Sequence, residues 1–589
     1  MRKWIPLWLG LCICLPGGLW ADGAKKKGLS SIPGEAVALL YAPTVKGLDD
    51  AYKGLINDLG LQFFLPPPFR SVTSLIAQYL PMFEGVDKTG TLALVLMPLD
   101  PLEPIDSKVA LIVPTKDPKS MLSALGALAD KEDQWTVNLM GQPTVALVRG
   151  QSLVLAKSTD VARAVQKSKV AMSDKLPATE LAAFTDMNLA LWVNTDHICK
   201  TYKSTIDTFV AMVTMMTQGS ENIWERLSAE RNRKSIESFV DGGRSVSIGL
   251  GYPEGGLALR SMTTYKPGSD FARQLGFRST SDPLLGGLPA SKYLVAFGHN
   301  MDPEQTKASL QSMDPFFEVM VESEGVNKDR ARRLLGHLEE SALLATALRG
   351  SVEILPAEEE GLLGFSAVLK TTDSKKWLAL IPQVVDLSKK LIVEAPSDLV
   401  SDEIKQLTRA LTYRSEVEEI EGASIGHLHF DLRKIGKLTE GDLEESLHIT
   451  GEEGALLRLG AVDGQTIAIS FGGGSKKMTR LIATSRSNEA PLQNDIGIKR
   501  VATRLPERSA FVSYVAVDNI VEAIQKILGA TDKGPLPLEM SNLNAPLLLA
   551  ASSEEGWSQF DVFIPTELLV GIKSASLTLM GSMRGAAAQ

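Results

Sequence analysis

Two histidines and an aspartate stand at alternate positions of one short segment, His427, His429 and Asp431. Alternate residues of a β-strand point to the same face, so a strand here would project two imidazoles and a carboxylate together. Zinc and iron accept such ligands, which makes the three residues a candidate metal site. A structural role is the favoured interpretation, because Asp431 follows a strand-like run where an aspartate commonly caps a helix.

A glycine-rich segment, 472–477, reads Gly-Gly-Gly-Ser-Lys-Lys and superficially resembles a phosphate-binding loop. Such a loop needs Gly-Lys-Ser/Thr between a strand and a helix, so that backbone N–H groups and the helix N-terminus face the phosphate. The Gly-Lys pair is missing here, and residues 478–483 have a strand-like composition. The segment is therefore predicted to be a hairpin turn.

Other signatures of catalysis are missing from the sequence, including Gly-x-Ser-x-Gly, Ser-x-x-Lys and His-Glu-x-x-His. Cys199 is the one cysteine beyond the N-terminal segment and is predicted to be a small packed side chain. We therefore assign no catalytic residue and no cofactor. A hydrolase whose site is assembled in space stays open as an alternative, since triads form in space and not in sequence.

The N-terminus has the layout of a signal peptide. Arg2 and Lys3 precede an apolar run that is too short to span a bilayer, and small residues follow it. Cleavage is predicted after Ala21, with Ala24 as the alternative. The sequence thus predicts an exported bacterial protein that is periplasmic, associated with the cell envelope or secreted, with 1–21 as the signal peptide.

The charge of the chain is acidic, with a formal net charge of −9. Loss of Arg2 and Lys3 would leave 59 basic and 70 acidic residues. Because nucleic-acid binding requires a basic stripe, nucleic acid is excluded as a partner. No later apolar run is long enough for a transmembrane helix. The nearest, residues 209–216, is predicted to be a buried helix with flexible methionine side chains.

Two kinds of segment recur along the chain. One is a lone strand that runs into Asp or Asn and then a helix; it is expected at 36–41, 188–193, 292–297, 424–430 and 510–517. The other is a hairpin followed by a helix start; it is expected at 92–113, 246–265, 351–369, 466–483 and 547–564. Hairpins with short turns imply antiparallel pairing. The prediction is an α+β fold of mainly antiparallel sheets, built from degenerate strand–helix–hairpin–helix repeats, with helices covering sheet faces.

A polar-to-glycine stretch at 278–287 separates the chain into near halves. It predicts an N-terminal α+β domain at 22–280 and a C-terminal α+β domain at 281–580. Residues 581–589 are predicted to be a flexible tail.

Three features together resemble an uncharacterised family of large exported bacterial proteins, classed as a domain of unknown function. They are the strand after Pro33 that leads to an Asp-started helix, the Val-Pro-Thr-Lys-Asp-Pro segment at 113–118, and the strand pair at 141–155. The likeness extends over residues 30–280. It implies an exported location and an α+β fold, and it brings no functional residues with it.

These patterns favour an exported, non-catalytic binding or scaffolding protein that acts through broad sheet surfaces. A carrier of an apolar ligand or lipid is the first alternative, since a curved sheet with helices can enclose an apolar cavity. Phe209, Met212, Val213 and Met216 are its candidate lining residues. The identity of a protein or apolar-ligand partner does not follow from the sequence.

Overall fold

A computed structural model describes residues 28–587 apart from 80–84, 99, 101–102, 132, 140, 186, 219–222, 276–277, 312–326, 357–360, 396, 398–399, 435–445, 452–453, 488, 530–539 and 541–542. The chain forms two compact units. Unit 1 consists of residues 1–212, 237–271 and 559–570, and unit 2 of residues 213–236, 272–558 and 571–589. The predicted signal peptide lies outside the described residues.

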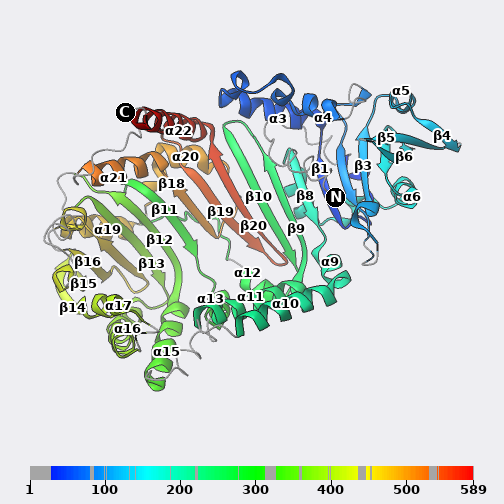
Figure 1. Cartoon of the computed structure of the whole chain (residues 1–589). Helices are drawn as coiled ribbons and strands as arrows, with labels where there is room; N and C mark the ends of the chain where they lie inside the picture. The colour runs from blue at the N-terminus through cyan, green and yellow to red at the C-terminus, as the bar shows by residue number, and fades with distance from the viewer. Residues whose placement is uncertain are drawn as a thin grey trace. The chain divides into compact units, whose positions relative to one another are not determined.

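Unit 1 is built on an antiparallel sheet with the strand order β4-β5-β6-β7-β3-β2-β1-β8-β9-β10 (Figure 1). Its strands are β1 (Ala38–Ala42), β2 (Leu92–Leu96), β3 (Val109–Pro114), β4 (Leu128–Lys131), β5 (Gln134–Leu139), β6 (Gln142–Arg149), β7 (Ser152–Ala156), β8 (Leu189–Val193), β9 (Gly243–Gly251) and β10 (Gly256–Tyr265). The centre of the sheet is therefore the first strand of the chain, β1, because later strands add on both sides of it.

One face of this sheet is covered by helices and forms the main core of the unit. Tyr41, Ile112 and Trp192 lie on this face and are packed against residues of α6, including Val161 and Val165. The helices of the unit are α3 (Val45–Asp58), α4 (Val72–Tyr79), α5 (Pro118–Ala124), α6 (Thr159–Lys167), α7 (Met172–Lys175), α8 (Ala178–Thr185) and α9 (Thr195–Thr201). Helix α3 begins as the sequence rules require, with Thr44 accepting the N–H of Gly47 as an N-cap.

Unit 2 repeats the strand order of unit 1. Its antiparallel sheet runs β14-β15-β16-β17-β13-β12-β11-β18-β19, so each strand occupies the place of the strand numbered ten lower in unit 1. The strands are β11 (Lys292–Asn300), β12 (Ala345–Ile354), β13 (Leu363–Thr371), β14 (Leu411–Ile420), β15 (Ala423–Phe430), β16 (Ala455–Ala461), β17 (Thr466–Phe471), β18 (Phe511–Val515) and β19 (Leu547–Glu554).

The helices of unit 2 are α13 (Pro303–Gln311), α15 (Lys328–Leu344), α16 (Ser374–Glu394), α17 (Asp402–Ala410), α19 (Gly474–Ser487), α20 (Ile496–Ala502) and α21 (Val517–Gly529). Helix α19 packs on one face of the sheet, called the covered face below, and α16 and α21 pack on parts of the other face. Met478 of α19 lies against Ser470 of β17, with 3.4 Å between the sulfur and the hydroxyl oxygen. The covered face is made of small and polar residues there, because Ser470, Ser366 and Ser351 stand opposite one another on neighbouring strands and are fully buried.

An ion pair is buried beneath α19. Lys477 and Glu353 have side chains that are 1% and 4% exposed, and the distance from Lys477 Nζ to Glu353 Oε1 is 2.5 Å. Ser366 donates a hydrogen bond to the same carboxylate oxygen at 2.8 Å, and Lys477 Nζ also donates to the carbonyl oxygen of Phe471 at 3.2 Å. The charge of Lys477 is therefore fully engaged inside the unit.

A few elements contain residues of both units. They are α10 (Lys203–Gln218), α11 (Ile223–Gly242), α12 (Asp270–Leu275), β20 (Trp557–Pro565) and α22 (Thr566–Ala587). The main change from unit 1 to unit 2 falls between Phe271 and Ala272. Helix α22 continues to Ala587, so residues 581–587 of the predicted tail are helical.

The α+β fold with antiparallel sheets and helices on sheet faces is confirmed, but two local predictions were wrong. Residues 478–483 belong to helix α19 and not to a strand, because Met478, Leu481, Ile482 and Ser485 are buried together at helical spacing. The strand predicted at 424–430 is not alone: it is the middle strand of β14-β15-β16. The flanking strands were missed because β14 is charged and exposed and β16 carries an arginine.

Replacement of Lys477 by Met should destabilise unit 2 by about 3–5 kcal/mol, because it leaves the Glu353 carboxylate buried without a cation. Urea unfolding of the full chain measures the effect. Lys376→Met is the matched control, since Lys376 forms an exposed pair with Glu340, and it should leave the unfolding midpoint unchanged. A Lys477→Met, Glu353→Met double variant should recover most of the loss; equal destabilisation by the single and double variants would contradict the role of the ion pair.

Candidate functional site

The residues proposed as metal ligands do not form a common site. His427 and His429 lie on β15, where His427 Nε2 is 2.8 Å from Glu418 Oε1 and His429 stands opposite Leu456. Asp431 follows the strand and accepts the backbone N–H of Arg433 at 3.2 Å, a capping contact at a short 3-10 helix. Among the residues that the structure describes, no group of three or more His, Cys, Asp or Glu is placed to hold a metal ion.

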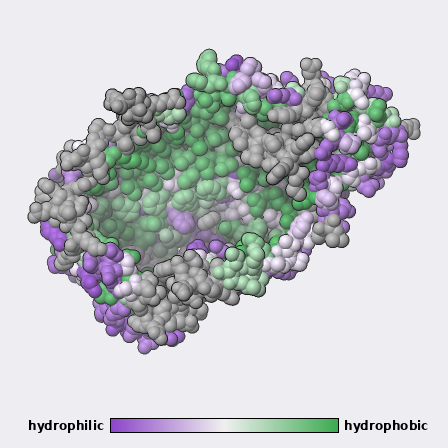
Figure 2. Space-filling model, viewed as in Figure 1, coloured by the Kyte–Doolittle hydropathy of each residue, from purple (hydrophilic) through white to green (hydrophobic). Residues whose placement is uncertain are grey.

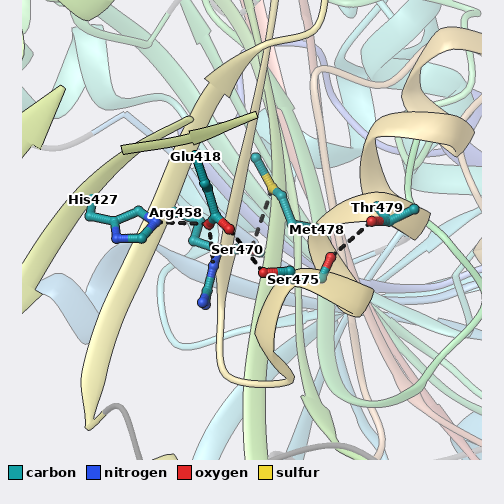
Figure 3. Close-up of polar contacts among 7 residues, drawn as sticks. All are labelled: Glu418, His427, Arg458, Ser470, Ser475, Met478 and Thr479. Carbon is teal, nitrogen blue, oxygen red and sulfur yellow. Dashed lines mark hydrogen bonds and ion pairs between the residues drawn. The ribbon is translucent and has the colours of Figure 1, made fainter. Parts of the chain in front are cut away.

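His427 belongs instead to a cluster around the Glu418 carboxylate (Figure 3). Arg458 Nε donates to Glu418 Oε1 at 2.9 Å, the same oxygen that His427 contacts. Ser475 donates its hydroxyl to Glu418 Oε2 at 3.0 Å. Four elements meet here, since Glu418 comes from β14, His427 from β15, Arg458 from β16 and Ser475 from α19.

The register of the strands brings these side chains together. His427 stands directly opposite Arg458 on the neighbouring strand β16. On the other side, the pairing of β14 with β15 shifts between Arg414 and Glu418, and Glu416 within that bulge has a φ of 53°. A bulge re-aims the side chains beside it, which is how Glu418 of an exposed edge strand reaches His427 and Arg458.

The environment of Glu418 stabilises its ionised form. Burial acts to raise the pKa of the carboxyl, but hydrogen bonds from His427, Arg458 and Ser475 outweigh burial and hold the pKa below its usual range. The carboxylate thus links the edge strand β14 to the start of α19.

The glycine segment is the other place where the expected structure was wrong. Gly472, Gly473 and Gly474 all have positive φ, at 67°, 69° and 61°, and they turn β17 directly into helix α19. Strand, glycine loop and helix are the context of a phosphate loop. Yet Lys477 is buried against Glu353 and the Ser475 hydroxyl is bonded to Glu418. The anion next to the start of α19 is therefore the carboxylate of Glu418.

This cluster does not have the geometry of a hydrolase. A nucleophilic serine must contact its general base, and the base must be oriented by a third group. Here Ser475 and His427 are bonded to opposite oxygens of one carboxylate, with Glu418 between them. The arrangement serves to fix three strands and a helix.

A second surface, the open face of unit 1, consists of large aliphatic side chains. Directly paired residues on five neighbouring strands form one row: Leu111, Leu94, Leu40, Leu191 and Ile248. Leu191 is 36% and Ile248 42% exposed. Leu259 of β10 and Phe560 of β20 are 39% and 42% exposed. Helices α3 and α4 pack on this face through Tyr52 and Ile76, in the cluster that Leu40 contacts. Leu111 packs against the buried cluster that contains Met121 of α5, so the exposed part of the row is Leu191 and Ile248.

Unit 2 has a corresponding open face. Its rows are Phe471–Phe365–Val352–Val295–Val515, Ile469–Ala367–Gly350–Phe297–Ser513 and Ile467–Leu369–Leu348–His299–Phe511. Helix α21 packs on one end through Ile520, and α16 on another through Trp377 and Leu378. Between them the large side chains are half-buried. Figure 2 shows hydrophobic side chains gathered over these strands, where the surface is hollowed, and no described helix crosses the middle of β12 and β13 in Figure 1.

The lining residues proposed for an apolar cavity are not in a cavity. Phe209, Met212 and Met216 lie on α10 and are at least half exposed, so the expectation of a buried helix was wrong. One pocket in unit 2 has a volume of about 130 Å³, well below that of most ligand sites. Its lining is mixed: Thr280, Ser281, Asp282, Gln493, Glu507 and Ser509 are polar, and Pro283, Leu284, Leu285, Leu505, Pro506, Val512 and Tyr514 complete it.

A buried glutamate in unit 1 was not predicted from the sequence. Glu180 of α8 accepts hydrogen bonds from Trp192 Nε1 at 2.7 Å and Ser245 Oγ at 2.5 Å. Burial raises the pKa of Glu180, against the effect of these two bonds. No motif marks the residue, since its partners lie 12 and 65 positions away. The Glu180 side chain is buried on the covered face of the sheet.

Comparison with known proteins gives only a fold likeness. No family model matches the chain, and no curated protein matches it. Three crystal forms of TP0453, a Treponema protein, match structurally over 50% of this chain and 96–98% of TP0453. Their sequence identities are 12–14% and their TM-scores 0.20–0.21, values too low to carry any argument about function.

Glu418→Gln should lower the free energy of unfolding at pH 7 by about 1–3 kcal/mol, because charge-assisted bonds to His427 and Arg458 are weakened. The lowered pKa of Glu418 means that its contribution is present above the ordinary carboxyl pKa and is lost as pH falls through the folded-state value. Chemical unfolding at pH 7 and pH 3 measures both effects. Glu419→Gln, at the exposed neighbouring position, is the control; equal losses for the two variants at pH 7 would refute the role of Glu418.

Proposed function

We propose that this protein is an exported, non-catalytic binding protein whose ligand is apolar, carried on the open faces of its sheets. The observation that supports this most directly is the row of directly paired leucines and isoleucine in unit 1, two of which are more than a third exposed. Exposed apolar surface of this extent marks an interaction site in soluble proteins.

The chemistry of the face favours hydrocarbon as the ligand. The row from Leu111 to Ile248 contains no hydrogen-bond donor, acceptor or charge in its side chains. Protein interfaces depend on Trp, Tyr and Arg at their energetic centres, and none of these residue types stands in the row. A lipid chain needs only apolar contact, which this row supplies.

The size of the face is adequate for an acyl chain. Four neighbouring strands, β8, β9, β10 and β20, carry the exposed side chains Leu191, Ile248, Leu259 and Phe560. At about 4.8 Å spacing these strands extend over about 14 Å. Burial of ten methylene groups would contribute roughly 8 kcal/mol at about 0.8 kcal/mol each. That is the scale of a micromolar Kd before ordering costs are subtracted.

Export is the second part of the proposal and rests on the N-terminal signal layout. An exported carrier needs no membrane span of its own, and no helix within the described residues is long and apolar enough to cross a membrane. N-terminal sequencing of the processed chain tests export, with Asp22 expected as the first residue.

Titration of the full chain with cis-parinaric acid, a fluorescent acyl chain, should give saturable binding with a micromolar Kd. Ile248→Asp should weaken that binding at least tenfold, because it places a charge among the exposed apolar side chains of the face. The residue is already 42% exposed, so the fold should survive, which circular dichroism checks.

Leu128→Asp serves as the matched control. Leu128 is a leucine on strand β4 that is 71% exposed and lies outside the open face. This variant should bind the probe like the unchanged chain. Absence of saturable binding, or equal weakening in both variants, would rule the proposed function out.

A further inference from the structure

We propose that helix α8 is a pH-sensitive latch on the covered face of unit 1, held tightly while Glu180 is protonated and loosened when Glu180 ionises. The latch lies on the side of the sheet opposite the open face, so it works whether or not an apolar ligand binds there. Three features of the Glu180 carboxyl group support it: its burial, the direction of its hydrogen bonds and the lack of a nearby cation.

The carboxyl group of Glu180 ties the helix to three neighbouring strands. Glu180 lies in the first turn of α8 and is 2% exposed. Trp192 of β8 donates its indole N–H to Glu180 at 2.7 Å, and Ser245 of β9 donates its hydroxyl at 2.5 Å. The hydroxyl oxygen of Thr264 on β10 lies 2.5 Å from that of Ser245. One helix residue therefore connects α8 to β8, β9 and β10.

The direction of these hydrogen bonds is the one expected for a neutral carboxyl group. Both donors point to the same oxygen, Oε1, which takes the place of the carbonyl oxygen of a protonated acid. The other oxygen, Oε2, is then available to carry the proton. A buried ionised carboxylate is costly, because the protein must replace its hydration. Burial accordingly raises the pKa of Glu180 by more than the two hydrogen bonds lower it.

The described strands around Glu180 offer it no cation. Strand β8 contains no charged residue. Arg244 of β9 is exposed and adjacent to Ser245, so it points to the opposite side of the sheet. Arg260 of β10 points to the covered side, but its Nε lies 2.6 Å from Oδ1 of Asp561.

The charged residues next to these strands are engaged with one another. Lys266 follows β10 and lies 3.1 Å from Asp196 of α9, which is also paired with Lys200 at 2.5 Å. His197 of α9 carries a further titratable ring, and a Glu180→Gln variant separates its effect from that of Glu180. Burial raises the pKa of three more groups in unit 1, so they stay neutral in acidic and neutral media: Tyr41, Tyr265 and Cys199.

Helix α8 is therefore bound most tightly in an acidic medium. Release of the helix would expose Glu180 to water, where a carboxyl group has its ordinary pKa. Because the docked state has the raised pKa, its stabilisation is complete below the ordinary carboxyl pKa and is lost as pH rises towards the docked-state value. Leu181 of the same helix packs against the main core of the unit. Release would therefore uncover Trp192 and Ser245 together with part of that core.

Hydrogen exchange of the full chain, measured by mass spectrometry on peptides that cover α8, tests the latch. The protection factors, corrected for the intrinsic pH dependence of exchange, should fall about fivefold or more between pH 5 and pH 8. No ligand is added, so the result is independent of the proposed function.

Three variants identify the group responsible. Glu180→Gln keeps the shape of the side chain and the Oε1 acceptor but cannot ionise, so its α8 protection should vary less than twofold over the same pH range. Ser245→Ala removes one bond that favours the ionised carboxylate, so the fall should be larger and should extend to higher pH. Glu254→Gln, at an exposed position in the turn between β9 and β10, should behave like the unchanged chain. Circular dichroism at pH 5 checks the fold of each variant.

Three results would overturn the inference. Constant protection of α8 in the unchanged chain would show that docking does not depend on the ionisation of Glu180. An equal fall in Glu180→Gln would assign the pH dependence to another group, such as His197. An unchanged fall in Ser245→Ala would contradict the contact through which the latch is held.

Discussion

Cross-strand register is the constraint on which the rest of this structure depends. In an antiparallel sheet, residues that stand directly opposite one another share a face, and a slip of one residue would exchange the two faces. Leu40 faces Leu94 and Leu191 in this register, while Tyr41 between them is turned to the covered side. The separation of an open apolar face from a helix-covered core follows from this register alone.

Unit 2 shows how strongly the register is held. Its covered face contains three stacked serines and the Lys477–Glu353 pair, and Ser366 donates a hydrogen bond to the Glu353 carboxylate there. A slip would expose these groups and drive the phenylalanines inward against α19. The buried polar groups thus specify which side of the sheet the large apolar residues occupy. We regard them as determinants of the open face, even though they lie on its reverse.

The sequence predicts the sheet well where strand patterns are strong. Alternating and continuous apolar runs locate β2, β9 and β13, and Asp373 marks the start of α16 through its bond to the N–H of Lys376. The apolar pattern does not predict α19, because residues 478–483 form a short run that mixes apolar and polar side chains. The helix is recognised only in the structure, where the side chains buried in α19 follow helical spacing. The pattern also fails at β14, because an exposed edge strand needs no apolar face.

The candidate sites show the same contrast between what local sequence patterns predict and what depends on contacts between distant residues. Local spacing drew attention to His427 and His429, but the partners that define the role of His427 come from 9 and 31 residues away along the chain. No local pattern encodes the bulge that brings Glu418 to them. The open faces were likewise hidden, since a half-exposed leucine and a buried one read alike in sequence. Which face the helices leave uncovered is a property of the assembled unit.

The shared strand order allows different side chains at corresponding places of the two units. The order fixes backbone pairing, which depends little on the size of side chains on the uncovered side. The core on the covered side must keep its volume, since a buried vacancy or clash costs several kcal/mol. Residues on the open face are free of that restraint, and Leu40 in one unit corresponds to Phe297 in the other.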